Sequence, residues 1–160
     1  MSNTHRKSIG DMVPVIDEVI SAGGNVRLDV KGNSMWPLLR SEIDSVLLKK
    51  PTDIKKYDVV LFKRTDGSFA LHRIVKITNS SLTTVGDNQY IFDQTVTPDA
   101  VIAKAVEFQR GKRRIGEKNI RLFGVLWVAL FPLRRLLRKG LSWIKNHLPV
   151  CIRSFVNKFR

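Results

Sequence analysis

The sequence predicts a mainly β protein: an antiparallel β-sheet or barrel, with a short N-terminal helix before it and a basic helical tail after it. Short β-rich runs alternate with turn residues between residues 25 and 109, and no helical pattern separates them. Strands at this density favour antiparallel pairing over βαβ units. Composition then changes near residue 110. We therefore expect an N-terminal helix at 1–24, a β-rich core at 25–109 and an amphipathic tail at 110–160.

The N-terminal helix is predicted from apolar residues at helical spacing between Asp11 and Ala22. Those apolar residues are Met12, Val15, Ile16, Val19 and Ile20. Asp11 is a candidate N-cap, and Gly23 with Gly24 is a candidate stop signal.

Two turn-forming stretches support hairpins in the β-rich core, Thr65–Ser68 and Thr78–Ser81. The β-rich runs lie at residues 26–30, 44–48, 57–63, 69–77, 82–85 and 101–108. Together they predict six strands joined largely by tight connections.

Charge is unevenly distributed along the chain. The formal net charge is +14, but residues 1–109 contain 14 Lys and Arg against 13 Asp and Glu, whereas residues 110–160 contain 14 against the single Glu117. The basic character therefore belongs to the tail. The one cysteine, Cys151, excludes an intrachain disulfide and a site of several thiolates, and its apolar neighbours argue against a catalytic thiol. We expect no metal and no cofactor.

Three short blocks carry the residue types that nucleophilic catalysis needs: Val30–Pro37 with Ser34, Leu71–Val75 with His72, and Val85–Asp93 with two carboxylates. A serine hydroxyl needs an adjacent base, and an imidazole base benefits from a carboxylate that fixes its tautomer. The other two histidines lie at the N-terminus and in the tail. A Ser–His–Asp site in this chain must therefore use His72.

In their order and spacing, the three blocks resemble those of the signal peptidase I superfamily, where an S-M-x-P block supplies the nucleophile and a later G-D-x-N-type block closes the site. The resemblance runs from about residue 26 to 108. It implies a signal-peptidase-like β domain and a serine endopeptidase that cleaves a precursor, leader or signal peptide. Because His72 stands where the bacterial branch usually has lysine, the chain is more similar to the endoplasmic-reticulum and sporulation-type branch.

Carried over to this chain, the resemblance makes Ser34 the nucleophile and His72 its base. Asp93 resembles the family position that contacts the histidine. Asp87 is the alternative for this role, and otherwise it would stabilise the turn. The backbone N–H of Ser34 is the natural oxyanion donor. Gly32 lacks the polar side chain that relatives often carry two residues before the nucleophile, so no second donor is assigned.

Met35, Trp36 and Pro37 resemble the apolar lip of the family's substrate groove, where an extended peptide pairs with an edge strand. The alternative is that Met35 and Trp36 belong to the hydrophobic core.

The tail contains an uncharged run of twelve residues at 122–133, flanked by basic residues on both sides. As a helix this run would reach about 18 Å, short of the ~30 Å hydrocarbon core of a membrane. Leucines and an isoleucine continue at helical spacing to Leu148 among Arg and Lys residues. We expect residues 122–148 to bind an anionic membrane surface, with the protein peripheral on the cytoplasmic face. The alternative is that this apolar face packs on the β domain or on a second copy.

The N-terminus shows neither a secretory signal nor a membrane anchor ahead of the serine, which departs from the usual signal peptidase plan. A DNA-binding, self-cleaving regulator shares the fold, but only about 25 residues precede the first expected strand and such regulators use a lysine base. No nucleic-acid partner is therefore expected. The sequence is also compatible with a catalytically silent β domain that binds peptides or membrane.

Overall fold

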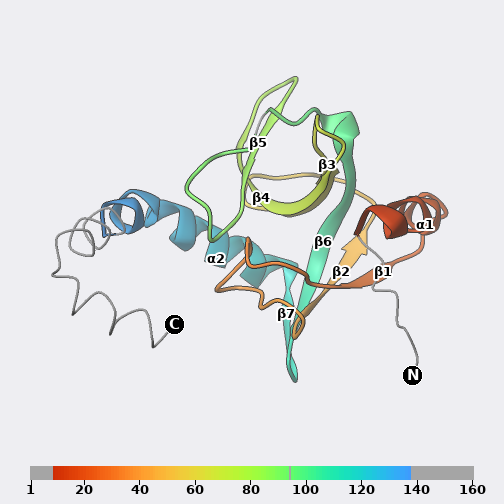
Figure 1. Ribbon diagram of the computed structural model, residues 1–160, viewed down its shortest axis with the longest axis horizontal. Helices are drawn as coiled ribbons and strands as arrows, with labels where there is room; N and C mark the ends of the chain where they lie inside the picture. Colours follow the sequence, from red (N-terminus) through yellow and green to blue (C-terminus); the bar gives the residue numbers. More distant parts are fainter. Residues whose placement is uncertain (1–8, 94, 138–160) are drawn as a thin grey trace, which may run out of the picture. The chain divides into compact units, whose positions relative to one another are not determined.

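A seven-stranded antiparallel sheet forms the core of the computed structural model, which describes residues 9–93 and 95–137 (Figure 1). The strands pair in the order β1-β2-β6-β3-β4-β5, and β7 pairs with β6. Their bounds are β1 (Val26–Asp29), β2 (Ser45–Lys49), β3 (Val59–Lys63), β4 (Phe69–Ile77), β5 (Leu82–Val85), β6 (Val101–Arg110) and β7 (Arg113–Gly116). The prediction of a mainly β, antiparallel protein is confirmed.

All six expected strands are present, with ends within two residues of the predicted ones. The seventh, β7, was not expected, because its sequence Arg-Arg-Ile-Gly looks like part of the basic tail. Gly111 has a positive φ of 58° and allows the tight return that pairs Arg110 with Arg113. The β-rich core therefore extends beyond the predicted limit at residue 109.

Helix α1 (Ile9–Ser21) begins two residues before Asp11, so Asp11 lies inside the helix and is not its N-cap. The predicted stop signal is confirmed. Gly23 has a φ of 84°, and the Gly24 N–H donates to the Val19 carbonyl oxygen at 2.8 Å. This closure of the last turn by a left-handed glycine is a common helix ending.

Both predicted hairpin turns are present. In the turn between β3 and β4, the Arg64 N–H donates to the Ser68 carbonyl oxygen at 2.7 Å, and Gly67 has a φ of 84°. In the turn between β4 and β5, the Thr78 N–H donates to the Ser81 carbonyl oxygen at 2.8 Å. These turns fix the register of β4, the strand that carries His72.

Two hydrophobic clusters fill the interior. The larger joins α1 and strands β1, β2 and β6 to the loop after β1, where Met35, Leu38 and Leu39 are buried. The smaller lies around Phe62 and Ile74 on β3 and β4. Burying a side chain of this size contributes about 1.5–3 kcal/mol. The three buried residues of the loop therefore anchor the segment that carries Ser34.

Helix α2 (Glu117–Ala129) follows β7 and buries Ile120 in the larger cluster. The chain divides into two compact units, one ending at Trp127 and one beginning at Val128. Residues 131–137 are also helical. Within the described residues, no helix is long and apolar enough to cross a membrane. The expected amphipathic continuation at 138–148 and Cys151 lie outside the described residues.

Candidate active site

Ser34 lies on the loop between β1 and β2, next to a side chain that is fixed in the core. Met35 is buried, whereas Ser34 itself is partly exposed. The Leu39 N–H donates to the Met35 carbonyl oxygen at 2.9 Å, which coils the chain directly after the serine. Ser34 is therefore held on a loop that is anchored in the core by its buried neighbour Met35.

The Gly86-Asp87-Asn88 turn packs directly against the serine loop. The Asn88 N–H donates to the Ser34 carbonyl oxygen at 2.8 Å, and Asn88 Nδ2 donates to the Asn33 carbonyl oxygen at 3.2 Å. A Cβ at Gly86 would lie 2.7 Å from the Ser34 carbonyl oxygen, closer than real side chains approach, so glycine is required at this position. The first and third sequence blocks are therefore joined mainly through backbone atoms.

His72 lies on β4, opposite Val60 of β3, and is only 2% exposed. Its Nδ1 is 2.6 Å from Asp93 Oδ2, which also accepts a hydrogen bond from Thr84 Oγ1 at 2.8 Å. The other carboxylate oxygen, Oδ1, accepts from Arg64 Nε and Nη2 at 3.2 and 2.8 Å. The side chains of Arg64 and Thr84 therefore hold the Asp93 carboxylate next to the His72 imidazole.

Burial by itself would raise the pKa of Asp93, but the hydrogen bond and charge of His72, with the hydrogen bonds of Arg64 and Thr84, outweigh it and hold the pKa below the ordinary 3.8. The carboxylate is therefore ionised at neutral pH and accepts a hydrogen bond from the Nδ1–H group of His72. In the neutral imidazole this arrangement leaves Nε2 as the basic nitrogen.

The second carboxylate of the third block, Asp87, binds Arg73 and not His72. Arg73 Nε and Nη2 lie 2.7 and 2.8 Å from the two Asp87 oxygens, and both side chains are almost fully buried. Asp93 is thus the carboxylate at the histidine, and Asp87 fixes the turn that supports Ser34. The sequence had left these two assignments open.

The Arg73–Asp87 pair is also enclosed by α2. Arg73 Nη1 donates to the Ile120 carbonyl oxygen at 3.0 Å, and the Trp127 indole N–H donates to the Asp87 carbonyl oxygen at 2.8 Å. A Cβ at Gly124 would lie 2.5 Å from Arg73 Nη1. The helix therefore completes the hydrogen bonding of a charged pair beneath the site.

Replacing Arg73 by methionine is expected to lower the free energy of unfolding by about 3–5 kcal/mol, because it leaves the Asp87 carboxylate buried without its ionic partner. Urea denaturation measures the loss. The matched control is Arg27→Met on β1, whose ion pair with Glu107 is partly exposed and should contribute less than about 1 kcal/mol. Equal losses in the two variants would contradict the assigned role of the buried pair.

Ser34 and His72 line one cavity of about 170 Å³, together with residues at the end of β1 and the start of β4. Met35 lines it as well, while Trp36 is 51% exposed and neither Trp36 nor Pro37 is among its described lining residues. Of the three residues expected to form the apolar lip, only Met35 lines this cavity, and Met35 also belongs to the hydrophobic core. Among the described residues, no hydrogen bond joins the Ser34 hydroxyl to the His72 ring.

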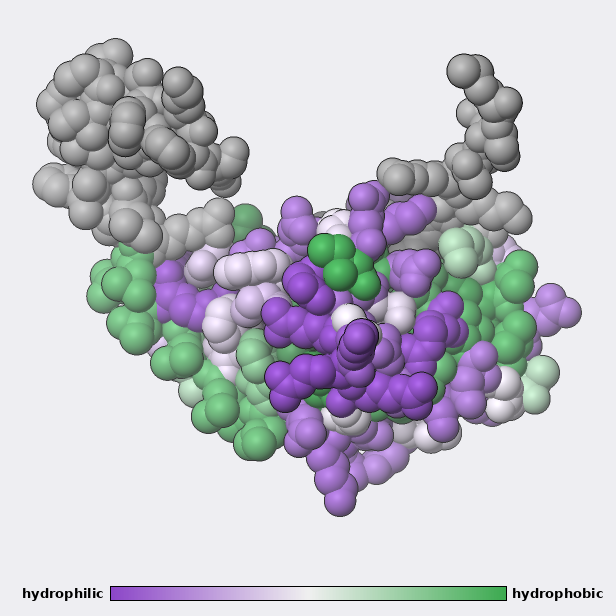
Figure 2. Space-filling view, turned by 90° about the horizontal axis from the view of Figure 1, so that it is seen from below, coloured by the Kyte–Doolittle hydropathy of each residue, from purple (hydrophilic) through white to green (hydrophobic). Residues whose placement is uncertain are grey.

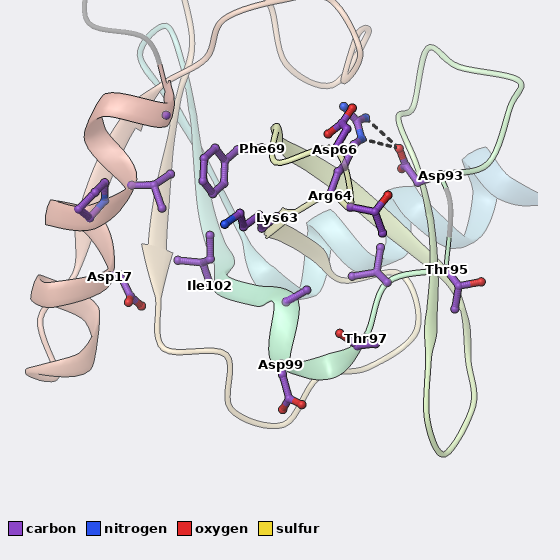
Figure 3. A pocket seen from close by; sticks show the side chains of 16 residues that line it. Asp17, Lys63, Arg64, Asp66, Phe69, Asp93, Thr95, Thr97, Asp99 and Ile102 are labelled. Atoms are coloured by element: carbon purple, nitrogen blue, oxygen red, sulfur yellow. Dashed lines mark hydrogen bonds and ion pairs between the residues drawn. The ribbon is translucent and has the colours of Figure 1, made fainter.

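A larger cavity of about 790 Å³ adjoins this one and shares Arg64 and Phe69 with it. Figure 3 shows its walls, with the Arg64–Asp93 pair on one side and Asp17 of α1 on another. The sequence blocks did not include Arg64 or Thr84. Both belong to ordinary β-strand and turn patterns, and only the sheet register brings them to Asp93.

Within the described part of the chain, no group of three or more His, Cys, Asp or Glu residues could hold a metal ion. The cavity of about 170 Å³ brings together a serine hydroxyl and an imidazole, and a carboxylate lies next to that imidazole. No protein-family model matches the chain, and no curated protein matches it.

Proposed function

We propose that this chain is a serine endopeptidase resembling the signal peptidase I superfamily, with Ser34 as nucleophile, His72 as general base and Asp93 as the residue that orients the base. One observation carries the proposal above all. An ionised carboxylate lies 2.6 Å from Nδ1 of a buried histidine, in the cavity that the candidate serine lines. The sequence blocks predicted Ser34 and His72 and left the choice between Asp87 and Asp93 open.

In the proposed reaction, His72 Nε2 takes the proton of the Ser34 hydroxyl as Oγ attacks the scissile carbonyl carbon. Asp93 stabilises the imidazolium that forms and keeps Nδ1 protonated. The imidazolium then gives its proton to the leaving amine, and a water molecule, deprotonated by His72, hydrolyses the acyl-enzyme. The serine–histidine hydrogen bond has to form on substrate binding, since such contacts are often long in free enzymes.

The backbone N–H of Ser34 is the proposed oxyanion donor. Among the described residues it donates to no other acceptor, so it is available to the tetrahedral intermediate. A donor of this kind contributes about 3 kcal/mol to transition-state stabilisation. The fixed loop on which Ser34 lies would keep this donor aimed before the substrate arrives.

The substrate is proposed to bind as an extended strand along β1. This strand pairs only with β2 among the described strands, and its last two residues, Leu28 and Asp29, line the cavity together with Val30. Pairing with a free edge supplies binding that does not depend on sequence, and the small cavity beside Ser34 favours a small side chain near the scissile bond. A precursor, leader or signal peptide with an exposed, extended cleavage site fits this requirement.

Incubation of the full chain with a broad peptide library, followed by mass spectrometry, tests the proposal. We expect cleavage by the wild-type chain at peptide bonds that share a small residue, and no such products with Ser34→Ala. Peptides that bind without being cleaved would instead support a silent peptide-binding domain, an alternative favoured because the hydrogen bonds of the described residues do not include one between Ser34 and His72. Equal cleavage by both proteins would overturn the proposed site.

A further inference from the structure

Helix α2 has two apolar faces, and the sheet covers only one of them. Ile120, Phe123, Gly124 and Trp127 face the interior, where Phe123 stacks on Trp127 with ring centroids 5.3 Å apart. On the other face Leu122 and Leu126 are 60% and 59% exposed. An amphipathic helix of a globular protein usually presents charged residues on its outer face.

Exposed apolar residues recur at helical spacing in each of the two compact units. In the first unit they are Leu122, Val125 and Leu126 of α2, and in the second they are Leu130, Leu133, Leu136 and Leu137, all at least 41% exposed. Figure 2 shows hydrophobic side chains gathered along α2, at the left of the view. Single exposed leucines are common on proteins, but several on one face of a helix mark a surface that binds something apolar.

Positive charge lies close to these exposed apolar residues in the sequence. Residues 110–137 contain eight Lys and Arg residues and one acidic residue, Glu117. Lys112, Arg113 and Arg114 are exposed on the hairpin that leads into α2, and Arg134 and Arg135 lie between Leu133 and Leu136 in the second unit. The occupant of the surface must therefore offer apolar groups and negative charge together.

We infer that the exposed apolar residues of α2 and those of residues 130–137 dock on the surface of an anionic lipid bilayer. Acyl chains would receive the leucines, and acidic headgroups would neutralise the flanking Lys and Arg residues. Nucleic acid would neutralise the charges but leave the leucines in water. A second copy would cover the leucines but bring two strongly basic segments together.

The docking is peripheral. The uncharged run at 122–133 is divided between α2, which ends at Ala129, and the helical residues 131–137. A helix lying in the plane of the interface uses one face and needs no span. The surface does not include Ser34 or His72, so it does not depend on the peptidase proposal.

Flotation with vesicles tests the inference on the full chain. We expect binding to phosphatidylcholine vesicles that contain phosphatidylglycerol, weak binding to pure phosphatidylcholine, and weaker binding as salt is raised. Replacing Leu122, Leu126 and Leu130 together by glutamine should weaken binding by more than about 100-fold, since each leucine contributes about tenfold when buried in lipid.

The matched control is Ile43→Gln, at an isoleucine that is 64% exposed in the loop between β1 and β2. It should bind vesicles as the wild type does. Unchanged binding by the leucine variant, or no binding of the wild type to anionic vesicles, would overturn the inference. So would a lipid-free dimer, measured by sedimentation velocity, that the leucine variant dissociates.

A second measurement guards against misfolding of that triple variant. In a Cys151→Ser background, the substitutions Leu126→Cys and Ile43→Cys each allow attachment of one polarity-sensitive dye. Anionic vesicles should shift the emission of the dye at position 126 to the blue and leave that at position 43 unchanged. The Ser34→Ala variant should bind vesicles normally, which separates this inference from a failure of the peptidase proposal.

Discussion

Replacing Ser34 by alanine is expected to lower kcat for a cleaved peptide by about 10⁴-fold or more, and His72→Ala is expected to do the same. The alanine variant has no hydroxyl to attack the carbonyl, and the histidine variant has no base to deprotonate it. The nucleophile and the base act in one step. The kcat of the double variant should therefore be close to that of either single variant. Initial rates on a peptide from the library measure all three.

Ser80→Ala is the matched control for the nucleophile, since Ser80 lies exposed in the turn between β4 and β5. It should retain wild-type kcat and KM. If the two site variants multiplied their losses, the serine and the histidine would act independently, and a shared proton-transfer step would be excluded.

Replacing Asp93 by asparagine is expected to lower kcat by about 10²–10⁴-fold with little change in KM. An amide at this position can donate to Nδ1, which favours the tautomer with the proton on Nε2, where the base must be free. Arg64 and Thr84 would remain in place, so the backbone of the site should be retained. Steady-state kinetics on the same peptide measure the effect.

Asp99→Asn is the control for this change, because Asp99 is an exposed carboxylate that lines the same larger cavity as Asp93 without contacting His72. Stability gives a second readout. The pKa of Asp93 is lower in the folded protein than its ordinary 3.8, so its stabilisation is present above that pH and is lost as the pH falls through the folded-state value. The wild type should lose more stability on acidification than Asp93→Asn, and equal losses would contradict the assigned ion pairs.

The sheet was predictable because strand patterns and turn residues are local. The hairpin at Thr65–Ser68 and the strand at 69–77 follow from a few neighbouring residues, and both are present as expected. Strand β7 was not predictable, because its residues are basic and its stability comes from pairing with β6. The prediction of Asp11 as the N-cap of α1 is wrong, because an aspartate can occupy an ordinary position in the first turn of a helix as well as a cap.

The assignment of the two carboxylates needed the structure. Asp87 and Asp93 lie in one block, and either could have reached His72 by spacing alone. Successive residues on a strand point to opposite faces of the sheet, so His72 and Arg73 of β4 lie on opposite sides and each takes one carboxylate. Arg64 could not be predicted for a similar reason, since its contact with Asp93 depends on where the segment after β5 returns to the sheet.

The most direct test of the proposed mechanism is to trap the acyl-enzyme. An activated ester of a cleaved peptide should acylate the wild-type chain faster than the acyl-enzyme is hydrolysed, and rapid quenching followed by mass spectrometry should find the acyl group on Ser34. The Ser34→Ala chain should carry no such adduct. Turnover of the ester with no adduct on Ser34, at a rate unchanged in Ser34→Ala, would contradict the assignment of this serine as the nucleophile.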